Sequence, residues 1–183
     1  FFFFWTGKYS GRIISLILSV FWLWMGIVYH IICFAGINSA AYVFGSVFII
    51  QGLLFFFFFF YKDQLNFEAK KSLKTYTAIL LVIFALLIYP VLGYLQGHVY
   101  PESPTFGVPC PTTIFTLGIL LLLKPHRILL MIIPLLWSVI GFTASFLLGI
   151  TEDIGLLAAG ITSLFFIFQK RTKAGAVWYM AFQ

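Results

Sequence analysis

Apolar runs close to the length that crosses a lipid bilayer follow one another along nearly the whole sequence. A hydrocarbon core of roughly 30 Å is crossed by about 20 helical residues, each rising about 1.5 Å. The chain has 62% hydrophobic and only 9% charged residues, which leaves too little polar surface for a soluble domain. We therefore predict an all-α polytopic transmembrane bundle with about six spanning helices, folded as a single membrane domain over residues 1–183. The predicted spans are 13–34, 39–61, 75–96, 112–123, 128–150 and 154–169.

The basic residues between these runs fall on alternate loops. If every predicted span crosses, all 11 Lys and Arg residues lie on one side of the membrane. Loops rich in Lys and Arg stay in the cytoplasm, so we expect the basic loops inside and the 97–110 loop outside. The net charge of +6 then reflects topology signals and contacts with anionic lipid headgroups. We expect the lipid bilayer as a partner and no nucleic acid.

The fourth predicted span, 112–123, is too short to cross a bilayer alone, since it gives only about 18 Å of helix. The segment before it carries prolines at positions 101, 104, 109 and 111, which prevent regular helix there. Irregular backbone at membrane depth is tolerated only inside protein or beside water. The sequence therefore predicts a partly re-entrant, proline-rich outer loop that leads into a short helix beginning near Pro111.

Small residues recur at four-residue spacing on the last two predicted spans. This spacing places them on one helix face, where they allow two helix backbones to approach closely. We expect these faces to pack within the bundle or against other membrane subunits. The residues are Gly141, Ser145, Gly149, Gly155, Ala159 and Ser163.

No Asp, Glu, Lys or Arg lies inside any predicted span. Proton- and sodium-coupled transporters place such groups near the membrane midplane, so this absence argues against coupled transport. The acidic 151–153 turn is instead expected to face outward. The sequence also contains no HExxH motif, no glycine-rich phosphate loop and no nucleophile with a recognisable base, so we predict that the protein is not an enzyme.

Polar residues near the predicted outer ends of the spans define a candidate outer pocket. His30 lies about two turns below the outer end of its helix, a depth that matches the predicted dip of the loop that begins at His98. Free N–H groups at a helix start near 110–113 favour an anion or a polar solute. The alternative is a loop that only plugs the outer face. The pocket residues are His30, His98, Tyr100, Thr105, Cys110, Thr112 and Thr113.

Both cysteines also lie on the predicted outer side, which leaves three interpretations open. One is a zinc or copper site, whose ligands would be His30, Cys33, His98 and Cys110. Another is a disulfide between Cys33 and Cys110 in an oxidising compartment, and the third is two unrelated buried thiols. We expect no cofactor, with the zinc or copper site as the alternative.

The long proline-rich motif HVYPESPTFGVPCPTTIFT at 98–116 resembles an uncharacterised family of multi-pass bacterial inner-membrane proteins. The likeness continues through 22–30, 37–41, 51–52, 133–137 and 153–160, and so covers most of the chain. The resemblance implies a shared fold in the bacterial plasma (inner) membrane, and it implies no activity or ligand. Members carry one more hydrophobic segment at the front, which fits our expectation that the N-terminus is incomplete and that residues 1–5 are the end of a further helix.

Two functional hypotheses follow. The first is a non-enzymatic integral membrane protein that serves as an accessory or structural subunit of a membrane assembly. The second is a permease or carrier that moves a small neutral or metal solute through the outward-facing pocket. The second hypothesis requires the pocket residues to converge on one place.

Overall fold

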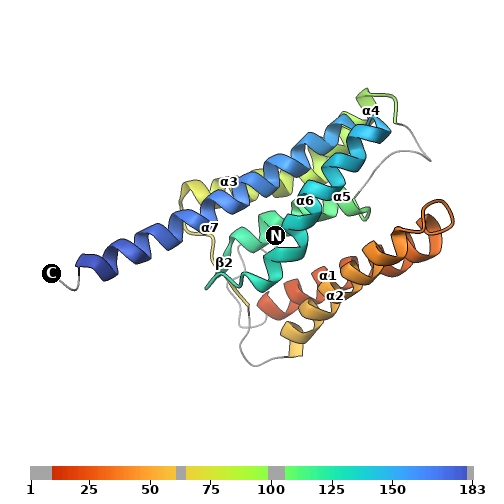
Figure 1. Ribbon diagram of the computed structural model, residues 1–183. Coiled ribbons are helices and arrows are strands. Elements are labelled where there is room, and N and C mark those ends of the chain that lie inside the picture. The colour runs from red at the N-terminus through yellow and green to blue at the C-terminus, as the bar shows by residue number, and fades with distance from the viewer. Residues whose placement is uncertain (1–9, 61–64, 99–105, 181–183) are drawn as a thin grey trace.

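The computed structural model describes residues 10–60, 65–98 and 106–180, with side chains except at 144–148 and 170–180. Helices dominate these residues and pack alongside one another (Figure 1), which confirms the predicted helical class. One short antiparallel ladder pairs β1 (Asn66–Phe67) with β2 (Leu123–Lys124). The helices in chain order are α1 (Ser10–Trp24), η2 (Met25–Phe34), α2 (Ala41–Phe60), α3 (Leu73–Ile83), η3 (Phe84–Ile88), α4 (Tyr89–Leu95), α5 (Pro109–Leu121), α6 (Leu129–Leu148), η4 (Thr151–Asp153) and α7 (Ile154–Met180).

Within the described residues, four helical segments are long and apolar enough to cross a membrane. Each lies within three residues, at either end, of a span predicted from the sequence. The shorter apolar stretches Pro109–Leu121 and Leu129–Thr143 lie where the fourth and fifth spans were predicted. The four long segments are Ser10–Phe34, Ala41–Phe60, Leu73–Leu95 and Thr151–Gln169.

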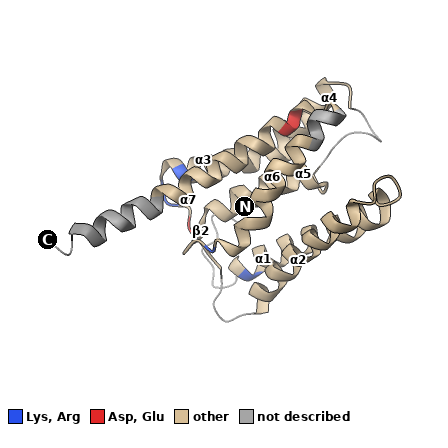
Figure 2. Ribbon diagram, in the orientation of Figure 1, with Lys and Arg blue, Asp and Glu red and all other residues tan. Residues whose placement is uncertain are grey.

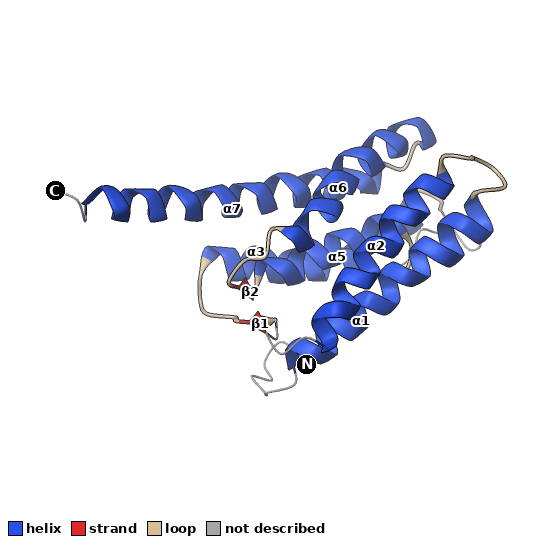
Figure 3. Ribbon diagram, turned by 60° about the horizontal axis from the view of Figure 1, so that its bottom comes forward, coloured by secondary structure: helices blue, strands red, loops and turns tan. Residues whose placement is uncertain are grey.

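The first two long helices form a tight antiparallel hairpin, which Figure 3 shows from below. A Cβ added at Gly26 would lie 2.8 Å from the Gly45 carbonyl oxygen, and one added at Gly45 would lie 2.9 Å from the Gly26 carbonyl oxygen. The missing side chains thus let the two backbones approach closely. In the turn between the helices, the Oδ1 of Asn38 accepts a hydrogen bond from the Ala40 N–H at 3.0 Å.

The third long segment runs through α3, η3 and α4 as one rod that contains a proline. Ser72 caps its start, because its hydroxyl accepts a hydrogen bond from the Thr75 N–H at 3.2 Å. Pro90 lacks an N–H and its ring would crowd the preceding turn of a regular α-helix. The wider π-helical turn η3 comes directly before it, and the Tyr89 N–H there bonds back to the Phe84 carbonyl.

The short helix α5 lies at the centre of the bundle, with nearly all its side chains buried. It packs against α3, α6 and α7, and the Trp22 indole N–H donates to the Thr116 hydroxyl at 3.0 Å to connect α1 to it. It begins at Pro109, two residues before the predicted start at Pro111. Its 13 residues span about 20 Å at 1.5 Å each, so α5 is short, as the sequence predicts.

The small residues of α6 and α7 are used inside the chain. A side chain at Gly141 would meet Leu156, one at Gly155 would meet Phe84, and one at Gly160 would meet Ser138. Ala159 and Ser163 are each 0% exposed. Gly141, Gly155, Ala159 and Ser163 of the predicted faces therefore pack within the bundle. A Cβ at Gly149 would meet nothing within 4 Å, and the Ser145 side chain lies outside the described residues.

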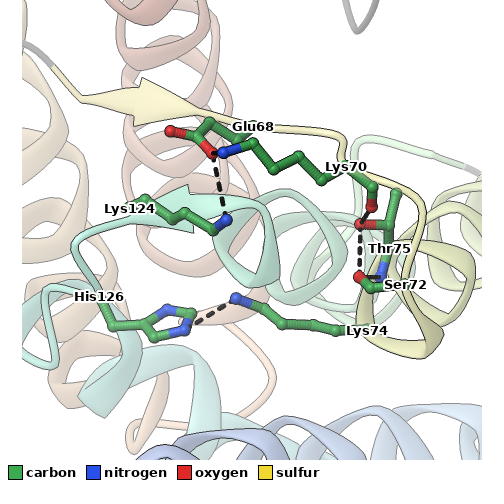
Figure 4. A network of polar contacts seen from close by, with 7 residues as sticks. All are labelled: Glu68, Lys70, Ser72, Lys74, Thr75, Lys124 and His126. Atoms are coloured by element: carbon green, nitrogen blue, oxygen red, sulfur yellow. Dashed lines mark hydrogen bonds and ion pairs between the residues drawn. The ribbon is translucent and has the colours of Figure 1, made fainter.

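Charged side chains separate to opposite ends of the bundle. Figure 2 shows Lys and Arg near β2 and the starts of α1 and α3, and acidic residues at the other end beside α4. The turn η4, which contacts α4, carries Glu152 and Asp153. At the basic end, Lys70 and Lys124 each lie 3.1 Å from Glu68, as Figure 4 shows. The hydrogen bond and the charge of Lys124, with those of Lys70, lower the pKa of the Glu68 carboxyl. This ion-pair network ties the β1 and β2 loops together.

Candidate functional site

Two adjacent carboxylates are buried at the end of the bundle away from the basic loops. Glu152 and Asp153 belong to the turn η4, and each residue is only 2% exposed. Gly149, with a φ of +71°, lets α6 end in a left-handed residue, after which the chain reverses into α7. The 151–153 turn, which we expected on the outer side of the membrane, has both of its acidic side chains buried in the bundle. Carboxylates removed from water need hydrogen-bond partners.

Asp153 is bound by two groups from different helices. The Tyr89 hydroxyl donates to its Oδ1 at 2.6 Å, and Tyr89 itself is 1% exposed. The Cys110 thiol, in the first turn of α5, forms a second side-chain hydrogen bond with Asp153. The N-terminal end of α5 therefore lies beside this carboxyl group. Asp153 joins α4, α5 and η4 at one point.

Glu152 contacts a histidine that leads from the buried site toward the surface. Its Oε1 lies 2.9 Å from the Nδ1 of His98, and their side chains are 0% and 28% exposed. The positive φ of Gly97, +88°, ends α4 and brings His98 into this position. Next to the pair, the Thr151 hydroxyl donates to the Gln96 side-chain oxygen. We call the five residues Tyr89, His98, Cys110, Glu152 and Asp153 the acidic cluster.

His30 is buried on the far side of Trp137 from this cluster. It is 2% exposed, and within the described part of the chain neither of its ring nitrogens has a hydrogen-bond partner. Its ring meets the Trp137 ring edge-on at 5.4 Å and the Phe48 ring at 4.7 Å. Trp137 in turn interacts with Cys110. A continuous set of side chains thus leads from His30 through Trp137 and Cys110 to Asp153.

The predicted pocket residues are brought together only in part. His98 and Cys110 belong to the acidic cluster, and His30 reaches it through Trp137. The Thr112 hydroxyl accepts from the Gly107 N–H at 3.1 Å, so it orders the start of α5. Thr113 is 0% exposed. Two further predicted residues, Tyr100 and Thr105, lie outside the described residues.

The structure does not assemble the hypothetical metal ligands. Cys33 is exposed and Cys110 is half-buried, and both are free thiols, so the disulfide interpretation is wrong. Among the described residues no three His, Cys, Asp or Glu side chains are grouped as metal ligands. The set His30, Cys33, His98 and Cys110 therefore has no common centre.

Four important residues of this region were absent from the predicted pocket: Tyr89, Trp137, Glu152 and Asp153. The signal for the acidic pair was present, since two of only 5 acidic residues stand next to each other at the start of an apolar run. Their burial depends on Tyr89, which is 64 residues away in the sequence. No local pattern connects such distant positions.

Comparison with known proteins gives one match. Residues 4–177 match the sequence profile of a family of unknown function, DUF6064. No curated protein and no solved structure matches the chain. The match agrees with the predicted relationship to an uncharacterised family, and it supplies no activity or ligand.

Proposed function

The chain belongs to this family of unknown function, and we propose that it is a non-enzymatic integral membrane protein that binds a small cationic solute at its acidic cluster. The bundle crosses the bacterial inner membrane six times in this proposal. The basic loops lie in the cytoplasm, and the acidic cluster and the 97–110 loop lie at the outer side. The protein acts as a permease or carrier for the bound solute.

The surface of the bundle supports the membrane location. Large apolar side chains are exposed along the long helices, for example Ile32 at 67%, Val43 at 64% and Leu87 at 63%. Such continuous apolar surface is unfavourable in water and favourable against lipid. The separation of basic and acidic side chains to opposite ends fits one orientation across a membrane.

The buried acidic pair is the observation that carries the solute-binding proposal. Ionisable groups inside an apolar bundle are costly, and they are retained mainly where they bind a solute or an ion. The pair weakens our sequence-based argument against charged transport sites, which rested on the absence of acidic residues inside the spans. Carboxylates, a hydroxyl and an imidazole at one end of the bundle favour a solute with a positive charge and hydrogen-bond donors.

Two further observations distinguish this proposal from the enzyme and the accessory-subunit hypotheses. The Cys110 thiol lies beside Asp153 and Trp137, and a neighbouring carboxylate disfavours the thiolate that a cysteine nucleophile needs. The accessory-subunit hypothesis relies on small-residue faces for partner contacts, and Gly141, Gly155 and Gly160 pack inside the chain. Solute binding is therefore the better supported function.

A thermal-stability screen of the purified protein in detergent tests the proposal. The probes are methylammonium, ethanolamine, choline and guanidinium, each as its chloride salt, with sodium chloride as the ionic-strength control. We expect at least one probe to raise the Tm of the wild type but not of Asp153→Asn, while Glu68→Gln responds as the wild type does. If no probe raises the Tm, or if Asp153→Asn responds equally, the acidic cluster is not a cation site.

A further inference from the structure

A second feature, at the basic end of the bundle, is a hollow between the start of α1 and the end of α2. The antiparallel hairpin brings these two helix ends together. The hollow has a volume of about 360 Å³ and is lined by Arg12, Ile13, Phe59 and Phe60. It lies where α1 begins, at the opposite end of the bundle from the acidic residues beside α4 in Figure 2. The acidic cluster therefore makes no use of it.

Arg12 is the polar group of this hollow. Its Nε is buried, and in residues 10–60, 65–98 and 106–180 this nitrogen has no hydrogen-bond partner. Three other basic side chains of this end have partners: Lys70 and Lys124 pair with Glu68, and Arg127 lies 5.0 Å from the centre of the Phe58 ring. The Arg12 guanidinium is a planar group of N–H donors, and its Nε has no partner among the described residues. Such a group suits a phosphate.

The other walls of the hollow are apolar and open to the outside. Phe60 is 66% exposed and Ile13 is 37% exposed. The Phe59 and Phe60 rings meet edge-on at 4.7 Å, so they form a firm aromatic wall next to the guanidinium. An arginine at the cytoplasmic end of an apolar helix pair suits a ligand that has an anionic head and a hydrocarbon tail.

We propose that this hollow binds one anionic phospholipid, with its phosphodiester on the Arg12 guanidinium and an acyl chain along Phe59 and Phe60. The inference rests on the proposed membrane location, because only a protein in the bilayer meets this ligand. Charge complementarity selects an anionic lipid over a zwitterionic one. The apolar wall selects a lipid over free phosphate.

Native mass spectrometry of the detergent-purified chain tests this site. The probes are phosphatidylglycerol and phosphatidylcholine with the same acyl chains, added at equal concentration. We expect phosphatidylglycerol to bind more tightly to the wild type, and Arg12→Gln to weaken its binding about fivefold. The matched control is Lys71→Gln, which removes an exposed lysine of the same end and should leave the affinity unchanged. Phe60→Ala should weaken binding of both lipids.

The outcomes distinguish failure of the lipid site from failure of the proposed membrane location. Equal binding of the two lipids, or equal losses in Arg12→Gln and Lys71→Gln, overturns the site while the proposed membrane location stands. Displacement of the lipid by millimolar inorganic phosphate shows a simple anion site and also overturns it. If Arg12→Gln does not fold, as judged by its Tm without lipid, the Phe60→Ala result decides. A chain that stays soluble without detergent overturns both this site and the proposed function.

Discussion

At the scale of single residues, the Tyr89 hydroxyl determines whether Asp153 is satisfied. Asp153 is 2% exposed, so water cannot replace a lost donor easily. Removal of one partner from a buried charged group costs about 1–3 kcal/mol, because the group left behind has already lost its water. The contact is thus both a stabilising bond and the arrangement that keeps the carboxylate in place.

We predict that Tyr89→Phe lowers the free energy of unfolding by about 1–3 kcal/mol. Urea or thermal unfolding in detergent, followed by circular dichroism, measures this change. The matched control is Tyr94→Phe on the same helix, because Tyr94 is 68% exposed. Equal stability of Tyr89→Phe and the wild type would show that the Tyr89 bond to Asp153 contributes nothing.

The cysteines give a second prediction at this scale. Both thiols are free in the structure, so protein unfolded without reductant should contain two reactive thiols per chain. In the folded protein, exposed Cys33 should react faster than half-buried Cys110, measured by mass spectrometry of the maleimide-labelled variants Cys110→Ser and Cys33→Ser. A titration that finds no free thiol would restore the disulfide interpretation.

At the scale of the elements, the α1–α2 hairpin depends on the close approach of Gly26 and Gly45. We predict that Gly26→Ala destabilises the chain by about 1–3 kcal/mol, since its Cβ would overlap the Gly45 carbonyl. Gly36→Ala in the connecting turn is the control, because a Cβ there meets nothing within 4 Å. The midpoint of unfolding measures both variants, and equal midpoints for Gly26→Ala and the wild type would contradict the packing argument.

The sequence predicts the helices far better than it predicts how they meet. Apolar length and loop charge were sufficient for the long segments and for the short α5. The pairing of Gly26 with Gly45 was missed, because each is a single glycine and the match exists only across the hairpin. Burial of Glu152 and Asp153 was missed for a related reason. A hydropathy pattern predicts that charged residues lie outside a span. In the structure, Tyr89 and Cys110 form hydrogen bonds with Asp153 and so allow its burial in the bundle.

At the scale of the whole molecule, the bundle has basic residues at one end and buried acidic residues at the other. The Glu68 network and Arg12 occupy the basic end, the enclosed α5 fills the middle, and the acidic cluster lies at the other end. In the orientation that we propose, the two proposed sites face opposite sides of the membrane. One would hold a lipid at the cytoplasmic side, and the other would receive a solute from outside.

Labelling in intact bacterial cells tests most directly the central claim that the acidic cluster lies at the outer end of a membrane-spanning bundle. Cysteines are introduced one at a time by Ile37→Cys and by Lys71→Cys. Ile37 is 81% exposed in the turn between η2 and α2, and Lys71 lies in the basic loop before α3. Both carry Cys33→Ser and Cys110→Ser. We predict that a membrane-impermeant maleimide labels the Ile37→Cys protein in intact cells and the Lys71→Cys protein only after permeabilisation. Equal labelling of both proteins in intact cells, or the reverse order, would contradict the account.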